Sequence, residues 1–304
     1  MLRRVQQYIR DHQLLSPQDK VLVCVSGGAD SVALLDVLHR GGYECIVAHC
    51  NFNLREQESD RDEQFVRLLV DEYNKTSVQT PVKLFVKHFD TISYAKANHI
   101  SIEMAARDLR YSWFDQLALE QQCRAIAVAH HQNDQAETVL LNLKRGTGLR
   151  GLCGMRPKSE NPMGGCVPVI RPLLCTTRDY IEHYLRNIRK LTWVNDSTNQ
   201  DTTIARNGIR EQLRTYSKAD IEHIAATAEY MQGYVDWLES RETRQAGRVQ
   251  LYEQLRNYRF PEVDKIYDAL QKGEGGKTFF APQHKAVIYN GKLKIESLET
   301  KPES

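Results

Sequence analysis

The sequence lacks any long apolar run. No stretch of about 18 consecutive apolar residues occurs in its 304 residues, so it predicts no membrane-spanning helix. The first fifteen residues, MLRRVQQYIRDHQLL, also lack the apolar centre of a secretion signal. Val5, Ile9, Leu14 and Leu15 instead favour an amphipathic helix. We therefore expect a cytoplasmic protein without a membrane partner.

Paired cysteines are also missing. None of the seven cysteines is spaced CxxC from another, so the sequence indicates neither a zinc site nor an iron–sulfur site. Cys24 and Cys45 fall inside apolar stretches, where a reduced thiol packs as a small hydrophobic group. A framework of disulfides is not expected in a cytoplasmic protein.

The chain has little net charge, only +2, but that charge is uneven. Residues 51–75 hold four basic and seven acidic side chains, a balance of −3. Residues 141–215 hold thirteen basic and six acidic side chains, a balance of +7. The basic stretch favours a polyanionic partner such as RNA. A solvated basic surface is the alternative that charge alone leaves open.

The most informative stretch is VLVCVSGGADSVALLDVLHR, residues 21–40. Residues 21–25 predict a short buried strand, and the apolar residues from Val32 to Leu38 recur at helical spacing. Between them lies SGGADS, a glycine turn that opens a helix. The first N–H groups of a helix have no backbone partner and carry partial positive charge, so such a turn suits a phosphate group.

This turn is not a Walker A loop, because no lysine stands at the start of the helix. It resembles the SGGxDS signature of the PP-loop ATP pyrophosphatase superfamily, whose members cleave ATP between its α- and β-phosphates. The resemblance implies Mg²⁺-ATP with pyrophosphate in the turn, and Asp30 as a Mg²⁺ ligand. Asp30 also fits the role of a helix amino-terminal residue. The implied ATP-binding residues are Ser26, Gly27, Gly28, Ala29, Asp30 and Ser31.

Strands alternate with helices in the first two thirds of the chain. Apolar segments at 21–25, 44–49, 83–88 and 124–130 predict four strands, each followed by a helical pattern. This order predicts an α/β fold with a doubly wound, mostly parallel, Rossmann-like sheet. Ligands then bind at the carboxyl ends of the strands. Residues 146–172, rich in glycine and proline, are expected to form a long functional loop.

The pattern of predicted elements changes near residue 216, from alternating strands and helices to a mainly helical segment. A long helix is expected from Ser217 to about Asn257, followed by a second helix over 261–271. Asn290-Gly291 between alternating apolar residues predicts a β-hairpin. We therefore divide the chain into a catalytic domain, residues 1–215, and a smaller, mainly helical domain, residues 216–304.

Two charged clusters are candidates for chemistry. Asp134 and Glu137 open the helix after the fourth strand and favour binding of an amine or a metal. His130 and His131 beside them leave a zinc site open as an alternative, although the HExxH pattern is absent. On an earlier helix Arg107 and Arg110 lie three residues apart, so they suit either phosphate binding or a surface ion-pair ladder.

The order of motifs resembles one family, the tRNA(Ile)-lysidine synthetase (synthase) family. HCNFNLR at 49–55 is similar to its HxNHxLR pattern, although Phe52-Asn53 replaces the usual pair. EMAARDLRY, AHHQNDQAETVLLNLKRGTGLRGLCGM, VIRPLL and NDSTNQDTTIARNGIR resemble its further segments. The likeness covers about residues 20–215. Many members carry a further C-terminal domain, which we expect this sequence to lack.

The resemblance implies a reaction and its partners. ATP adenylates the oxygen at carbon 2 of the wobble cytidine of a tRNA(Ile) with a CAU anticodon. The ε-amine of free L-lysine then attacks that carbon and expels AMP. Asp36, Asp134 and Glu137 are the implied catalytic or lysine-binding residues. The implied phosphate or substrate contacts are His49, Asn51, Arg107, Arg110 and His131, and the implied tRNA contacts are Lys144, Arg145, Arg206 and Arg210.

Other functions remain open at this stage. A PP-loop tRNA thiolase is the nearest alternative, although that chemistry usually shows CxxC pairs. A small-molecule synthetase of the superfamily would not need the basic stretch, and a regulatory module would not need the acidic pair. The sequence also leaves a homodimer open.

Overall fold

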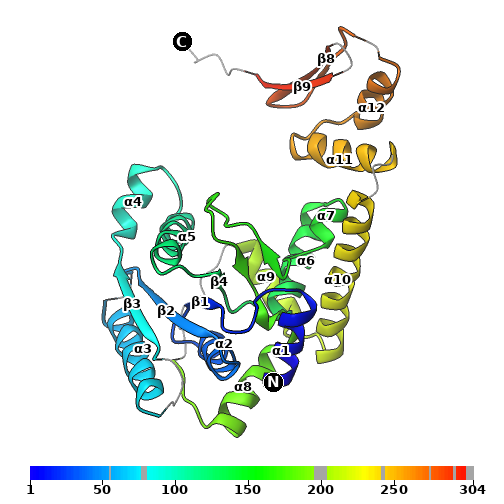
Figure 1. Cartoon of the computed structure of the whole chain (residues 1–304). Coiled ribbons are helices and arrows are strands. Elements are labelled where there is room, and N and C mark those ends of the chain that lie inside the picture. Colours follow the sequence, from blue (N-terminus) through cyan, green and yellow to red (C-terminus); the bar gives the residue numbers. More distant parts are fainter. Residues whose placement is uncertain are drawn as a thin grey trace. The chain divides into compact units, whose positions relative to one another are not determined.

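The computed structural model describes residues 1–54, 56–76, 81–194, 204–240, 244–273, 275–289 and 292–298. Within these ranges, the side chains of residues 56, 204–207, 240 and 244–250 are not described. The chain divides into two compact units (Figure 1). One comprises residues 1–147 and 151–229, and the other comprises residues 148–150 and 230–304.

The first unit is built on a six-stranded sheet in the order β3-β2-β1-β4-β6-β5. Every pair is parallel except β5 with β6, so the predicted doubly wound, mostly parallel α/β fold is confirmed. The strands are β1 Lys20–Cys24, β2 Glu44–Asn51, β3 Lys83–His88, β4 Ala125–Ala127, β5 Lys158–Ser159 and β6 Val169–Ile170.

Alternating side chains of the strands separate two apolar layers. Val21 and Val23 of β1 are buried in a core with α1, α2 and α3, whereas Leu22 belongs to a second core with α5. This alternation follows from the two-residue period of a strand. In Figure 1 these helices lie on opposite sides of the sheet. Their bounds are α1 Leu2–Asp11, α2 Ala29–Arg40, α3 Glu56–Thr76, α4 Thr91–Ala97 and α5 Ile102–Glu120.

The order of the strands reverses beside β1. From β1 the chain proceeds outward to β2 and β3, and it then returns to place β4 on the other side of β1. Ligands of such open sheets bind at this reversal, outside the carboxyl ends of the strands. The SGGADS turn follows β1 there, and α6, Gln132–Arg145, begins shortly after β4. The topology therefore brings the two best sequence candidates to the same edge.

The loop predicted for residues 146–172 contains structure of its own. It holds α7, Leu149–Leu152, and the two strands β5 and β6 that extend the main sheet. The 3-10 helix η1, Pro172–Cys175, then leads into α8, Arg178–His183, and the π-helix η2, Tyr184–Arg189. The last helices of the first unit are α9, Ile204–Leu213, and the start of α10, Lys218–Ser240.

Helix α10 begins as the sequence predicts. Ser217 N donates to Asp220 Oδ2 at 2.8 Å, and Asp220 N donates to Ser217 Oγ at 3.2 Å, which is a reciprocal cap. The helix expected to run to Asn257 is described as two helices, α10 to Ser240 and α11 over Arg244–Asn257, and residues 241–243 between them lie outside the described residues.

The second unit has its own small core. Leu255 of α11 and Ile266 of α12, Val263–Gln271, pack with Ala286 of an antiparallel sheet. That sheet has the order β7-β8-β9, Thr278–Phe280, His284–Tyr289 and Lys292–Ser297. The predicted hairpin is confirmed by pairing of β8 with β9, whereas Asn290 and Gly291 lie outside the described residues. The functional boundary near residue 216 stays a prediction.

Within the described ranges, no helix combines the length and the apolar character that crossing a bilayer demands.

Candidate active site

The two serines of the SGGADS turn hold its backbone in place. Ser31 Oγ accepts hydrogen bonds from Ser26 N and Gly27 N, both at 3.2 Å, and donates to Gly28 O at 2.9 Å. Ser26 Oγ accepts from Gly28 N at 3.4 Å. Helix α2 begins directly after Gly28. The hydroxyls thus preform a tight turn whose helix start carries the partial positive charge that attracts phosphate.

Gly27 is required by the backbone at this turn. Its φ of +99° lies in the region that residues with a Cβ avoid. A Cβ there would meet Phe65 of α3 and Val194 at ordinary contact distances of 3.4 and 3.7 Å, so the backbone angle is what calls for glycine. Val194 N donates to Gly27 O at 3.0 Å. The turn is therefore fixed from three sides, by its own serines, by α3 and by the segment after the π-helix.

The turn fits a nucleotide bound with Mg²⁺. Asp30 Oδ2 is paired with Arg178, whereas the buried Oδ1 finds no hydrogen-bond partner among the described residues. Burial raises the pKa of the Asp30 carboxyl, although the charges of His131 and Arg178 oppose this. A cation at Oδ1 would satisfy that oxygen. Mg²⁺ is usually bound by one or two carboxylates together with substrate phosphates, so Asp30 suits this role.

The start of α6 lies beside this turn. His131, the residue before α6, is buried, and its Nε2 is 3.7 Å from Asp30 Oδ1 and 3.4 Å from Asp134 Oδ2. Asp134 Oδ2 also accepts from His131 N at 2.9 Å, which caps the helix. Among the residues that the structure describes, no three histidine, cysteine or acidic side chains are placed to hold a metal ion. Through its two short distances, to Asp30 and to Asp134, His131 lies between the phosphate turn and the acidic pair.

Glu137 lies one turn further along α6. Its side chain is almost fully buried, and Oε2 accepts from Arg210 Nε of α9 at 2.9 Å. The structure thus brings together Glu137 and Arg210, which the sequence assigns to lysine binding and to tRNA binding. A buried carboxylate with a paired guanidinium is stable only while both partners remain. The pair also anchors α9 to α6 beside the site.

Arg107 and Arg110 of α5 are both exposed, but they lie over different rings. The guanidinium of Arg110 stacks on Phe52 at 5.1 Å from the ring centre, and that of Arg107 stacks on Tyr111 at 5.1 Å. Phe52 in turn stacks on Phe89. Arg110 is therefore held at the carboxyl end of β2 by the aromatic side chain that departs from the family pattern.

His49 and Asn51 are buried at the end of β2. His49 Nδ1 donates to Val25 O at 2.8 Å, and burial lowers the pKa of its imidazole, which favours the neutral ring. Asn51 Nδ2 donates to Glu63 Oε2 at 3.1 Å, and Asn51 Oδ1 accepts from the following turn. The contacts of both side chains join β2 to β1 and α3. Substrate contact by these two residues stays a prediction.

Asp36 does not reach this edge of the sheet. It lies about 10 Å along the axis of α2 from Ala29, at a rise of about 1.5 Å per residue. Its fully buried carboxylate accepts from Tyr73 Oη at 2.8 Å, from Tyr184 Oη at 2.5 Å and from Arg189 Nε at 3.0 Å. The expectation that Asp36 lines the crevice is corrected by this geometry, because its carboxylate is fully buried against side chains of α3 and of the π-helix η2.

The other predicted tRNA contacts are dispersed. Lys144 and Arg145 are exposed in the last turn of α6, roughly 16 Å along the helix axis from Asp134. The side chain of Arg206 lies outside the described residues. Basic side chains at this distance suit a large polyanion better than a nucleotide.

Sequence reasoning missed Arg178, the first residue of α8. Its guanidinium pairs with both Asp30 and Glu182. The signal available in the sequence was weak, since the segment VIRPLLCTTRDY begins with the unrecognised strand β6 and places Arg178 eight residues after its end.

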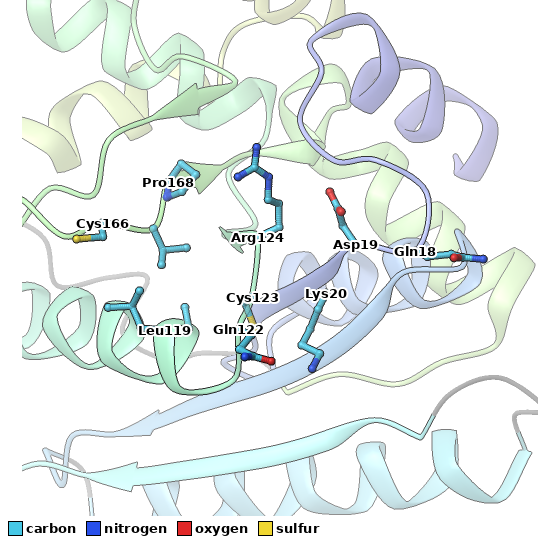
Figure 2. A pocket seen from close by; sticks show the side chains of 11 residues that line it. Gln18, Asp19, Lys20, Leu119, Gln122, Cys123, Arg124, Cys166 and Pro168 are labelled. Atoms are coloured by element: carbon cyan, nitrogen blue, oxygen red, sulfur yellow. The ribbon is translucent and has the colours of Figure 1, made fainter.

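A cavity of about 450 Å³ lies at the opposite edge of the sheet (Figure 2). It is lined by residues at or before the amino-terminal ends of β1, β4 and β6, among them Lys20, Arg124 and Pro168. Cys123 and Cys166 also line it. None of the site residues predicted from sequence borders this cavity.

Comparison with known proteins matches residues 1–217 to the PP-loop domain family. A tRNA(Ile)-lysidine synthase from Bacteroides thetaiotaomicron is 49% identical over 211 residues, which cover 69% of this chain and 46% of that protein. One from Parabacteroides distasonis is 40% identical over 328 residues, covering 99% and 71%. The chain thus spans about half of the first relative and about seven tenths of the second.

A solved structure shares the fold. The U34-tRNA thiolase from Methanococcus maripaludis with its 4Fe-4S cluster superposes with a TM-score of 0.60. It is 16% identical, and the match covers 80% of this chain and 81% of that chain. At this identity the likeness concerns the fold alone.

Proposed function

Because this chain belongs to the tRNA(Ile)-lysidine synthase family, we propose that it joins free L-lysine to carbon 2 of the wobble cytidine of a tRNA(Ile) with a CAU anticodon. ATP is cleaved to AMP and pyrophosphate in the same reaction. One observation supports this most directly: His131 lies between Asp30 of the phosphate turn and Asp134 of the acidic pair. A site for nucleotide phosphates and a site for an ammonium group are therefore adjacent.

The reaction assigns different tasks to the two ends of the site. The new bond joins the lysine ε-nitrogen to carbon 2, and the oxygen lost from that carbon leaves in AMP. The SGGADS turn would hold the phosphates of ATP, and Asp30 would hold the accompanying Mg²⁺. Such preorganised groups stabilise the charge that develops during phosphate cleavage.

The acidic pair binds and deprotonates the lysine. Its ε-ammonium must lose a proton before the nitrogen can attack, and a carboxylate within hydrogen-bond reach is suited to orient it and take that proton. Asp134 is the more exposed of the pair, whereas Glu137 is held by Arg210. We assign Asp134 to direct contact with the ammonium. Glu137 would line the site next to Asp134 without contacting the ammonium.

Lysine transfer gives the decisive test. Incubation with ATP, Mg²⁺, labelled lysine and a tRNA(Ile) with a CAU anticodon is expected to give label in the tRNA and one AMP for each lysine. A tRNA(Met) with the same anticodon tests recognition outside the anticodon. ATP cleavage accompanied by sulfur transfer, with no lysine in the RNA, would overturn the proposal in favour of the thiolase. We propose the cytoplasm as the location of this reaction, where these substrates occur.

The basic end of α6 gives a second prediction. Changing Lys144 and Arg145 together to glutamate is expected to weaken tRNA binding and to lower the slope of log affinity against log salt by about 1.4 to 1.8, because each phosphate contact contributes roughly 0.7 to 0.9. ATP binding should not change. Filter binding at several salt concentrations measures the slope.

A matched control for this prediction uses two lysines outside the basic stretch. Lys75 and Lys96 are exposed in α3 and α4, and their change to glutamate alters the net charge equally. We expect the control to retain the slope of the unmodified protein. Equal slopes in all three proteins would mean that the end of α6 is a solvated surface without RNA contacts.

A further inference from the structure

Arg178 is fixed at the edge of the phosphate turn by its backbone. Its N–H donates to Asn133 Oδ1, in the first turn of α6, at 3.0 Å. This bond ties the start of α8 to the start of α6. The position of the Arg178 side chain is therefore set by the same helix that carries Asp134.

The guanidinium of Arg178 contacts two carboxylates through different nitrogens. Nη1 donates to Asp30 Oδ2, and Nε donates to Glu182 Oε1 at 2.8 Å. Glu182 lies four residues further along and is partly exposed. Loss of the Asp30 contact would thus leave the side chain anchored through Nε, with Nη1 still pointing at the phosphate turn.

Arg178 supplies the positive charge nearest to Asp30 in this structure. Oδ2 is occupied by the guanidinium, whereas His131 Nε2 is 3.7 Å from Oδ1, beyond hydrogen-bond distance. Burial opposes the charged form of Arg178, but Asp30 and Glu182 outweigh it and raise its pKa. A buried carboxylate needs such a partner, and a divalent cation meets the same need more strongly.

We propose that Arg178 competes with Mg²⁺ for the Asp30 carboxylate and transfers to the phosphates of ATP when Mg²⁺ takes its place. The inference rests on the proposed function for the role of Asp30. A guanidinium released beside the turn suits a phosphate, because its N–H groups match the phosphate oxygens in pairs. Arg178 is thereby a nucleotide-binding residue that also keeps Asp30 neutralised before the metal arrives.

Titration with MgCl₂ alone tests the competition without any turnover. Thermal melting of Arg178→Met is expected to respond to Mg²⁺ at about tenfold lower concentration than the unmodified protein, since the competing cation is gone. Arg214→Met removes an exposed arginine that pairs with Glu211 only by a surface contact, and it should respond as the unmodified protein does. Asp30→Asn should abolish the response in every background.

Glu182→Gln gives an opposite prediction and perturbs only a partly exposed side chain. Without the second carboxylate, Arg178 is attracted to Asp30 alone, so about two- to threefold more Mg²⁺ should be needed for the same shift in melting temperature. This variant tests the competition even if Arg178→Met folds poorly.

Binding of a fluorescent ATP analogue with Mg²⁺ tests the transfer. Arg178→Met is expected to weaken it about tenfold, with Arg178→Lys between the two, while the affinity for Mg²⁺ alone rises. A purely structural role would change both affinities in the same direction.

Identical Mg²⁺ responses in Arg178→Met, Glu182→Gln and the unmodified protein, all lost in Asp30→Asn, would overturn the inference and leave the lysine-transfer function intact. Opposite shifts in Mg²⁺ and ATP affinity without any lysine transfer would instead support Arg178 and overturn the function.

Discussion

Asp30→Ala is expected to abolish ATP–pyrophosphate exchange, with activity at least a hundredfold below that of the unmodified protein. The turn keeps its own hydrogen bonds in this variant, because the serine hydroxyls that fold it do not involve Asp30. The loss therefore concerns the metal rather than the phosphate cradle. Removing one preorganised electrostatic contact to a developing charge costs typically about 10² to 10³ in rate.

The same variant should be as stable as the unmodified protein or more stable near neutral pH. Burial raises the pKa of the Asp30 carboxyl, so the folded state favours its neutral form. The ionised carboxylate then lowers stability at pH values above the raised pKa, and this cost is removed as the pH falls through that value towards the ordinary carboxyl range. Asp30→Ala should flatten this part of the stability profile, measured by urea unfolding at several pH values.

Asp71→Ala provides the control for this experiment. Asp71 is an exposed carboxylate of α3, and its removal should change neither exchange nor stability by a measurable amount. Normal exchange by Asp30→Ala would remove the metal assignment. Unfolding of Asp30→Ala would show that the carboxylate holds the turn together.

Asp36→Ala is expected to cause the largest loss of stability, about 3–5 kcal/mol, because it removes a fully buried carboxylate and leaves the partly exposed Arg189 without its partner. Tyr73 and Tyr184 lose their acceptor at the same time. Burial and the hydrogen bond to Asp36 raise the pKa of Tyr184 to about 12, which fits a hydroxyl that stays protonated and donates. Urea unfolding measures the difference.

The conservative variant separates packing from chemistry. Asp36→Asn keeps the shape and one acceptor, so it should lose less stability than Asp36→Ala, while the KM for lysine should stay within about twofold of the unmodified value. The exposed Asp71→Ala again serves as the reference. A stable Asp36→Asn that no longer uses lysine would return Asp36 to the active site, where the sequence had placed it.

Local patterns explain why much of the fold could be predicted. The strands near residues 21, 44 and 83 are apolar runs between turn signals, and the helix after SGGADS repeats its apolar residues at the right spacing. These signals depend on neighbours within a few residues. The topology then follows, since alternating strands and helices permit few arrangements.

Two-residue strands gave no such signal. β5 and β6 lie inside the segment 146–172, where neither an alternation of two nor a helical period can appear. Their partners are set by the fold, since β6 pairs with β4 and β5 pairs with β6. The loop expected there therefore proved to contain the strand that leads to Arg178.

The site could be predicted only where the residue type itself is diagnostic. The SGGADS turn and Asp134 are such cases. Asp36 and Arg178 are not, because Asp36 contacts Tyr184, and Arg178 contacts Asp30, across 148 residues of the chain. The roles of such charged residues depend on contacts between distant parts of the chain, and the periodicity of the sequence does not reveal these contacts.

The cavity at the opposite edge of the sheet offers a site for selective chemical labelling. Cys166 on its rim is exposed, whereas Cys45, Cys123 and Cys153 are buried and the other three are partly covered. Burial also raises the pKa of the Cys123 thiol to about 11, which leaves little reactive thiolate at neutral pH. A maleimide dye should therefore label Cys166 first. The dye would then lie at the edge of the sheet opposite the phosphate turn and leave that turn unmodified.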